Sequence, residues 1–175
     1  MDVARIGVLT VSDRAAAGIY ADEGGPAIRA TLDEMLACEW KPVSMVVPDG
    51  IESVRGAIMQ LADVVGCDLI LTTGGTGPAP RDLTPEGTEA ACDKMMPGFG
   101  ELLRRKSLEQ VPTAILSRQT AGIRGSTLVI NLPGRPASIR MSLMAVMPAI
   151  PYCLDLIGAR RIETRPDVVP SFRPG

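Results

Sequence analysis

The residues best suited to chemistry occur in three short polar stretches, each of which follows an apolar run. They are Ser12-Asp13, Pro48-Asp49-Gly50 and the stretch from Gly74 to Asp82. The carboxylates of Asp49 and Asp82 are hard oxygen ligands, and Mg²⁺ is often held by one or two such groups together with substrate phosphates. Successive N–H groups in a glycine-rich turn form a site for anions. These residue types would suit a phosphate-bearing substrate and a bound cation.

The glycine-rich stretch Thr72–Pro78 follows the apolar run Leu69–Leu71, which is typical of a buried strand. Glycines let a ligand approach the backbone closely because they carry no Cβ. The loop differs from the commoner phosphate-binding motifs, since no Lys-Ser/Thr pair follows Gly77 and Pro80 stands where a dinucleotide fingerprint has its third glycine. A purely structural turn is therefore an open alternative. The adjacent pair Arg81-Asp82 favours a ligand site, because charged residues on loops at strand ends commonly act on ligands.

The other polar stretches also have a structural interpretation. Ser12-Asp13 is typical of a turn that caps a helix, and Pro48-Asp49-Gly50 is a common turn after a strand. Ser138 follows the Pro133-Gly134 turn and either caps a helix or reaches a ligand. The residues alone leave these alternatives open. A shared edge of one sheet would bring the stretches together into a single site.

The composition excludes several kinds of chemistry. The chain has 175 residues, a net charge of −2 and no histidine, so histidine-based catalysis and histidine metal sites are ruled out. The four cysteines are widely spaced and form no CxxC pair, which argues against a zinc site. The near-neutral charge and an aromatic content of 3% argue against binding to nucleic acid or to an anionic membrane.

The apolar runs are too short to cross a membrane, and charged residues interrupt the first of them where a signal peptide would be apolar. We therefore expect a cytoplasmic protein. Apolar runs at residues 4–11, 43–47, 69–71 and 127–130 predict buried strands. Helical spacing predicts helices over residues 25–37, 51–65, 84–95, 99–108, 138–147 and 150–157.

The helix over residues 84–95 is expected to begin with Thr84 as its N-cap and Pro85 as its first residue. Residues 122–125 are typical of a turn, and the proline-rich stretch from about residue 165 is expected to be an extended tail. The alternation of strands and helices predicts one α/β domain over residues 1–175, with a mostly parallel sheet covered by helices on both faces.

Several motifs occur in a fixed order along nearly the whole chain. They are Ile6–Val8, Val11–Arg14, Thr72–Pro78, Arg81-Asp82, Thr84-Pro85, Met96–Glu101, Leu116–Arg118 and Asn131–Gly134. In this order they resemble the MoaB/Mog superfamily of molybdenum-cofactor proteins. The resemblance implies a three-layer sandwich with one antiparallel edge strand, usually assembled as a homotrimer.

The resemblance also implies an activity, which is the transfer of AMP from ATP to the terminal phosphate of molybdopterin with release of diphosphate. Asp49 and Asp82 are then the catalytic acids and the ligands of Mg²⁺. The residues implied to hold the nucleotide are Ser12, Thr73, Gly74, Gly75, Thr76 and Gly77. Those implied to border the substrate pocket are Ser117, Arg118, Pro133 and Gly134. The product would pass to a molybdenum-inserting protein.

Two other functions fit the same resemblance. One is a module that binds molybdopterin without adenylylating it, and the presence of both Asp49 and Asp82 favours the enzyme over this alternative. The other is a nucleotide hydrolase of the CinA type, but those proteins carry extra domains for which 175 residues leave little room.

Overall fold

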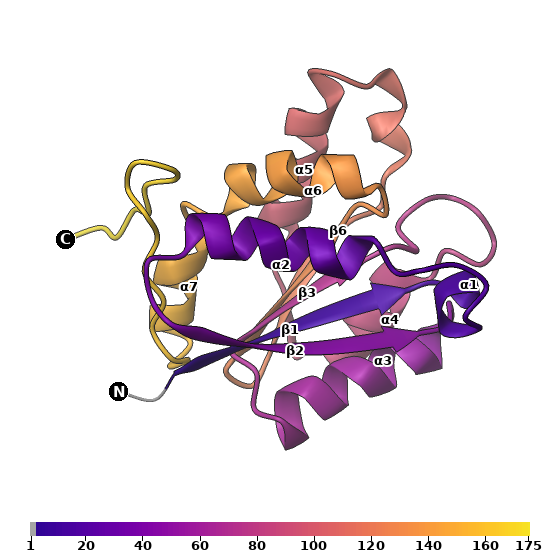
Figure 1. The fold of residues 1–175 in the computed structure, drawn as a ribbon, viewed down its shortest axis with the longest axis horizontal. Coiled ribbons are helices and arrows are strands. Elements are labelled where there is room, and N and C mark those ends of the chain that lie inside the picture. Colours follow the sequence, from indigo (N-terminus) through magenta and orange to yellow (C-terminus); the bar gives the residue numbers. More distant parts are fainter. Residues whose placement is uncertain (1–2) are drawn as a thin grey trace.

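The computed structural model describes residues 3–175, which form a six-stranded sheet between two layers of helices (Figure 1). The strand order is β2-β1-β3-β6-β5-β4. The strands are β1 (Ala4–Val11), β2 (Trp40–Val47), β3 (Leu69–Thr73), β4 (Lys94–Met95), β5 (Ala121–Arg124) and β6 (Thr127–Leu132). The central strand β3 is buried along its whole length, as its apolar run predicts.

The first four strands of the sheet order are parallel to one another. β1 pairs with both β2 and β3, and β3 pairs with β6. β5 pairs antiparallel with β6, and the short β4 pairs antiparallel with β5 at the sheet edge. The predicted α/β class, with a mostly parallel sheet and antiparallel pairing at one edge, is confirmed. The carboxyl ends of β1, β2, β3 and β6 consequently lie at the same edge of the sheet.

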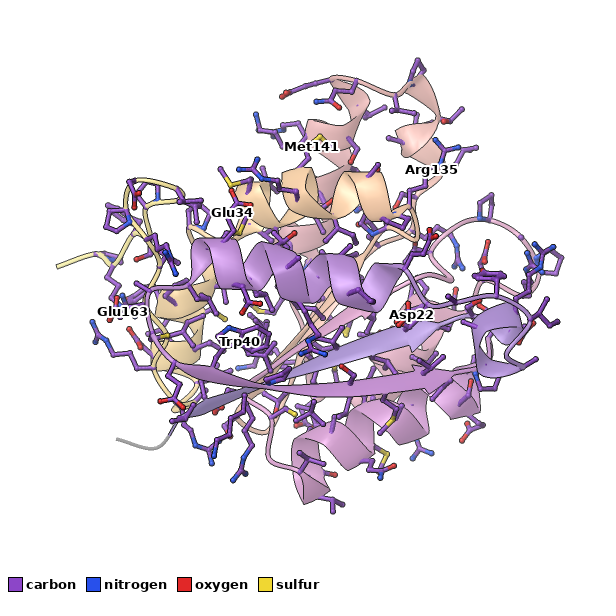
Figure 2. All side chains as sticks on the ribbon, viewed as in Figure 1. Asp22, Glu34, Trp40, Arg135, Met141 and Glu163 are labelled. Carbon is purple, nitrogen blue, oxygen red and sulfur yellow. The ribbon has the colours of Figure 1, made fainter. Side chains whose placement is uncertain are left out.

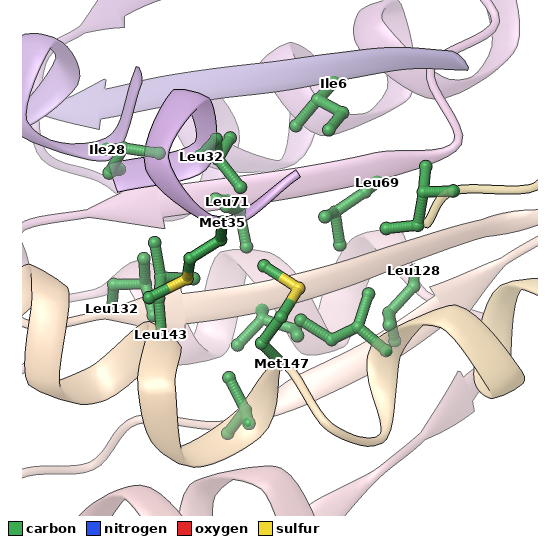
Figure 3. Packing of buried hydrophobic residues seen from close by; sticks show 14 of the residues in the cluster. Ile6, Ile28, Leu32, Met35, Leu69, Leu71, Leu128, Leu132, Leu143 and Met147 are labelled. Carbon is green, nitrogen blue, oxygen red and sulfur yellow. The ribbon is translucent and has the colours of Figure 1, made fainter. Parts of the chain in front are cut away.

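Helices cover both faces of the sheet. They are α1 (Asp13–Ala16), α2 (Gly24–Met35), α3 (Ile51–Met59) with its π-helical extension η1 (Gln60–Val64), α4 (Thr84–Ala91), α5 (Pro97–Leu108), the 3₁₀ helix η2 (Pro112–Leu116), α6 (Pro136–Val146) and α7 (Ile150–Leu156). One apolar cluster joins α2, α5, α6 and α7 to the sheet, and a second joins α3 and α4 to its other face. Figure 3 shows the first cluster, in which Leu32 and Met35 of α2 pack near Leu71 and Leu143.

Two local predictions at the antiparallel edge are wrong. The helix expected over residues 84–95 ends at Ala91, because Cys92 is extended and Lys94-Met95 then pair with β5 as a two-residue strand. The turn expected at 122–125 is instead β5, and only Gly125, with φ of 55°, turns the chain. Such short strands show no alternation in the sequence, so pairing with a neighbouring strand decides them.

The start of α4 also differs from the prediction. Leu83 is the N-cap, and Thr84 is the first helical residue. The Thr84 hydroxyl donates to the carbonyl oxygen of Gly74 at 2.9 Å and therefore ties the helix to the glycine-rich loop instead of capping it. At α6 the N-cap is Arg135, so Ser138 is not the cap of that helix.

The segment after residue 165 has no helix or long strand and packs against its own chain. Val169 is buried in the main apolar cluster, and the N–H of Phe172 donates to the carbonyl oxygen of Pro148 at 2.9 Å. The Arg173 guanidinium donates to the carboxylates of Asp155 and Glu163. These contacts attach the end of the chain to α7 and to the preceding loop.

No single helix within residues 3–175 has both the length and the apolar composition to cross a bilayer. Helices α6 and α7 reach that composition only as a pair, and the chain bends by 60° between them. Both helices contribute residues to the main apolar cluster of the domain.

Candidate functional site

A cavity of about 430 Å³ opens at the carboxyl ends of β1, β2 and β3. Three of the predicted stretches contribute to its walls: Ser12-Asp13, Asp49 and the segment that includes Thr73–Gly75 and Asp82. The parallel register explains this convergence, because Val11 at the end of β1 lies opposite Val47 of β2 and Thr10 lies opposite Thr73 of β3. The structure thus brings Asp49 and Asp82 to one cavity, as expected from the sequence.

Asp49 is fixed by a reciprocal pair of hydrogen bonds with Asp13. The N–H of Asp13 donates to Oδ2 of Asp49 at 3.0 Å, and the N–H of Asp49 donates to Oδ1 of Asp13 at 3.0 Å. Burial raises the pKa of the Asp49 carboxyl above its ordinary range, and the negative charges of Asp13 and Asp82 act in the same direction. The N–H bond from Asp13 and the charge of Arg81 oppose this rise without cancelling it.

The raised pKa of Asp49 predicts that Asp49→Asn stabilises the fold at neutral pH. A carboxyl whose pKa is higher in the folded state binds more protons there, so stability falls as pH rises from the ordinary value of 3.8 through the raised value. Asparagine carries no titrating charge, so the variant does not lose this part of the folding free energy as the pH rises. Urea unfolding at neutral pH should therefore give a higher midpoint for the variant, with no difference below the ordinary carboxyl pKa. A lower midpoint at neutral pH would contradict the prediction.

The glycine-rich loop needs its glycines. Gly74 and Gly75 have φ of 97° and 65°, a region that side chains disfavour. A Cβ on Gly74 would lie 2.2 Å from the carbonyl oxygen of Val11, and one on Gly75 would lie 3.1 Å from Oδ1 of Asp49. A Cβ on Gly77 would lie 2.9 Å from Oδ2 of Asp82. Both carboxylates are therefore packed directly against the loop.

Ser12 serves the fold and the cavity at once. Its hydroxyl oxygen accepts from the N–H of Ala15 at 3.2 Å as the N-cap of α1, and it lies 3.2 Å from the Tyr20 hydroxyl. Ser12 and Tyr20 both line the first cavity. The sequence interpretation as a cap and the interpretation as a site residue are compatible.

Asp22 is a cavity residue that sequence reasoning missed. Its carboxylate accepts from the Thr10 hydroxyl at 2.9 Å and from the N–H of Gly25 at 3.0 Å, and it lines the first cavity. Figure 2 labels Asp22. An acidic residue shortly before a helical pattern is a recognised capping signal, and it could have drawn attention to Asp22.

A second cavity of about 290 Å³ lies beside the first. Its walls include Thr76, Gly77, Ser117, Gln119 and Pro133, with Arg135 and Met141 of the α6 region, which Figure 2 labels. Gln119, which the sequence did not single out, is 3% exposed, and its amide nitrogen donates to the Ser117 hydroxyl at 2.6 Å. Its amide oxygen is buried and has no hydrogen-bond partner among the described residues.

The two cavities meet at the glycine-rich loop and at the turn after β6. Thr73–Gly75 line the first cavity and Thr76–Pro78 the second. In the turn, Gly134 lines the first cavity and Pro133 the second. The Thr73 hydroxyl donates to the Pro133 carbonyl oxygen at 2.8 Å and joins the two turns into one wall. Two ligands bound on either side of this wall would lie next to each other.

Arg118 lines neither cavity, although its motif suggested the substrate pocket. Its guanidinium donates to the carbonyl oxygens of Gly77 and Asp82 and to the Glu86 carboxylate. The Glu86 carboxylate raises the pKa of Arg118, and the Arg118 hydrogen bonds lower the pKa of Glu86. Glu86 was not singled out from the sequence, since nothing in its spacing marks it as a partner of Arg118.

The carboxylate oxygens of the first cavity suit a cation that takes its remaining ligands from a bound substrate and from water. Oδ2 of Asp49 accepts from Asp13, and Oδ2 of Asp82 accepts from the N–H of Ala79 at 3.2 Å. Within the described residues neither Oδ1 accepts a hydrogen bond, and no group of three or more Cys, Asp or Glu side chains is poised around a metal position. Mg²⁺ in nucleotide sites typically has few protein ligands and takes others from phosphates and water.

Comparisons with known proteins agree with this architecture. Residues 7–152 match a family model described as a probable molybdopterin binding domain. The chain is 52% identical to molybdopterin adenylyltransferase of Helicobacter pylori, with 99% of each chain covered. It is 44% identical to molybdopterin adenylyltransferase of Escherichia coli K12, with 99% of this chain and 95% of that protein covered. The structure of the molybdopterin biosynthesis enzyme MoaB from Thermus thermophilus superimposes with a TM-score of 0.82 at 43% identity, covering 92% of this chain and 100% of that one.

Proposed function

Since this chain belongs to the family of molybdopterin-binding domains matched over residues 7–152, we propose that it is a molybdopterin adenylyltransferase. In this reaction an oxygen of the terminal phosphate of molybdopterin attacks the α-phosphorus of ATP. The bond from that phosphorus to the bridging oxygen breaks, and diphosphate leaves with the electron pair. The products are adenylyl-molybdopterin and diphosphate.

The observation that carries the proposal is the pair of cavities on either side of the glycine-rich loop. A transfer between two substrates needs both reacting atoms held close together and in line. The first cavity, with Asp49 and Asp82 in its wall, suits the polyphosphate of ATP. The second cavity, with Ser117, Gln119 and Pro133, suits molybdopterin. Their common wall would bring the attacking phosphate next to the α-phosphate.

Asp49 and Asp82 are the residues that would hold Mg²⁺, each through the oxygen that no protein donor occupies. When bound, the ion would neutralise charge on the phosphates and on the departing diphosphate. The chain itself supplies the rigid placement of these carboxylates: Asp13 fixes Asp49, and the loop from Gly77 fixes Asp82. The N–H groups of Gly74 to Gly77 are suited to the phosphate oxygens.

The direct test combines the protein with ATP, Mg²⁺ and molybdopterin. Mass spectrometry should detect adenylyl-molybdopterin, and a coupled assay should detect an equal amount of diphosphate. Omission of either substrate is the control. If molybdopterin binds but neither product forms, the chain is a binding module and the proposed reaction is wrong.

Removal of divalent metal is predicted to abolish turnover without unfolding the protein. With no histidine and no cysteine pair in a CxxC motif, the chain offers hard oxygen ligands, and these favour Mg²⁺ or Mn²⁺. Activity should vanish with EDTA and return with excess Mg²⁺, while the circular dichroism spectrum stays unchanged. Unfolding by EDTA would indicate a structural metal, and unchanged turnover would exclude a catalytic one.

The same proposal extends to assembly and location. We expect a homotrimer in the cytoplasm that passes its product to a molybdenum-inserting protein. Exposed apolar side chains support an association of copies, among them Ile19, Ile115 and Phe172, each at least 70% exposed.

A further inference from the structure

We infer that Arg118 and Glu86 form a positioning pair that holds the loop over residues 77–82, and with it the Asp82 carboxylate, while the neighbours of Arg118 line the second cavity. The inference rests on the proposed function. It assigns to Arg118 a role different from that of a ligand-binding residue, and it introduces Glu86 as part of the catalytic arrangement. Neither residue is placed in contact with a substrate.

Arg118 contacts both ends of this loop. Its main-chain N–H donates to the carbonyl oxygen of Thr76 at 2.8 Å, and its side-chain Nε donates to the carbonyl oxygen of Gly77 at 2.9 Å. At the other end of the loop, its Nη2 donates to the carbonyl oxygen of Asp82. Beyond the loop, the guanidinium forms a forked ion pair with Glu86 in the first turn of α4. One planar group thus fixes the separation of the two ends of the loop.

The contacts explain why an arginine is needed. The guanidinium presents its donors in a rigid fork, whereas a lysine ammonium is a single point charge on a flexible stem. Lysine at residue 118 could still pair with Glu86, but it could not bond Gly77, Asp82 and Glu86 in the same geometry. The carboxylate of Asp82 accepts only the Ala79 N–H within the described residues, at 3.2 Å, so its position depends on the main chain that Arg118 holds.

Arg118 also connects the walls of the two cavities. Ser117 and Gln119, its neighbours in sequence, line the second cavity, while Asp82 lines the first. A ligand that orders Ser117 and Gln119 therefore acts on a residue bonded to the main chain of Asp82. This arrangement predicts that the pair affects turnover more than substrate binding, because Asp82 is placed for the transition state.

The test compares Arg118→Lys and Glu86→Gln with Arg124→Lys as the matched control. Arg124 also forms a forked pair, with Asp63, and also donates to a main-chain carbonyl, that of Ala91, but it lines neither cavity. We expect R118K and E86Q to lower kcat on the order of 10-fold or more with KM for ATP changed less than about 2-fold, since a small misplacement of a catalytic group suffices for such losses. R124K should leave both constants unchanged.

A double variant shows whether the pair acts through Asp82. In the Asp82→Asn background, Arg118→Lys should cause no further loss of kcat, because residues that act as a unit are not additive. The half-saturating concentration of Mg²⁺ should rise in R118K with Asp82 present. Losses that multiply in the double variant, or a lowered melting temperature with normal kcat in both R118K and E86Q, would overturn the inference. A wild-type protein that makes no adenylyl-molybdopterin would instead refute the proposed function.

Discussion

Asp49→Asn and Asp82→Asn are each expected to lower kcat by on the order of 10²-fold or more, the scale of losing one preorganised electrostatic contact of about 3 kcal/mol. Both carboxylates lie in the wall of the first cavity, where the charge of the departing diphosphate would develop in the proposed reaction. Asparagine keeps the shape of each side chain and its capacity to accept an N–H bond, so the loss reports the charge. Steady-state kinetics with ATP and molybdopterin measure it.

The matched control for these variants is Asp93→Asn. Asp93 also accepts a main-chain N–H in a turn, that of Gly125 at 2.8 Å, and it lines neither cavity. Its replacement should leave kcat unchanged. Asp49→Asn and Asp82→Asn should retain molybdopterin binding, measured by equilibrium dialysis, since the acids are assigned to the nucleotide. Normal turnover with a lowered melting temperature would instead mean that Asp49 and Asp82 merely form turns.

The sequence could predict that the polar stretches meet at one site, because their meeting depends on the topology of the sheet. A buried apolar run followed by a polar turn predicts a strand end, and the ends of parallel strands share one edge. Asp49 and the glycine-rich loop could therefore be expected together before any coordinates were known. Ser12 was expected at the same edge, with a capping role left open, and in the structure it caps α1 and also lines the first cavity.

The partners of Arg118 could not be predicted in this way. Its motif, Leu116–Arg118, also contains Ser117, which does line the second cavity, and proximity in sequence suggested the same pocket for both side chains. The direction of a long side chain is set by the groups packed around it, here the carbonyl oxygens of Gly77 and Asp82 and the Glu86 carboxylate. No local pattern in the sequence encodes such long-range contacts. The same limit applies to β4, whose two residues become a strand only through pairing with β5.

Gly74→Ala is expected to have the largest effect on stability. The residue has φ of 97°, and an added Cβ would lie 2.2 Å from the carbonyl oxygen of Val11, a main-chain atom that cannot move without disturbing β1. Strain at such a φ costs about 1–3 kcal/mol, and overpacking adds a similar amount, so we expect a total loss of roughly 2–6 kcal/mol. The melting temperature should fall by roughly 4–24 °C. Thermal and urea unfolding measure the change.

Two other glycines separate the causes of this loss. Gly158 has φ of 73° but no atom within 4 Å of an added Cβ, so Gly158→Ala should show the backbone strain alone, about 1–2 kcal/mol. Gly56, inside α3, has neither constraint, and Gly56→Ala should stabilise the helix by about 0.5–1 kcal/mol. The excess loss of Gly74→Ala over Gly158→Ala then measures the collision with Val11. If Gly74→Ala and Gly158→Ala lose the same stability, the loop accommodates the added Cβ without disturbing β1. The contact with Val11 then does not determine the position of the wall between the cavities.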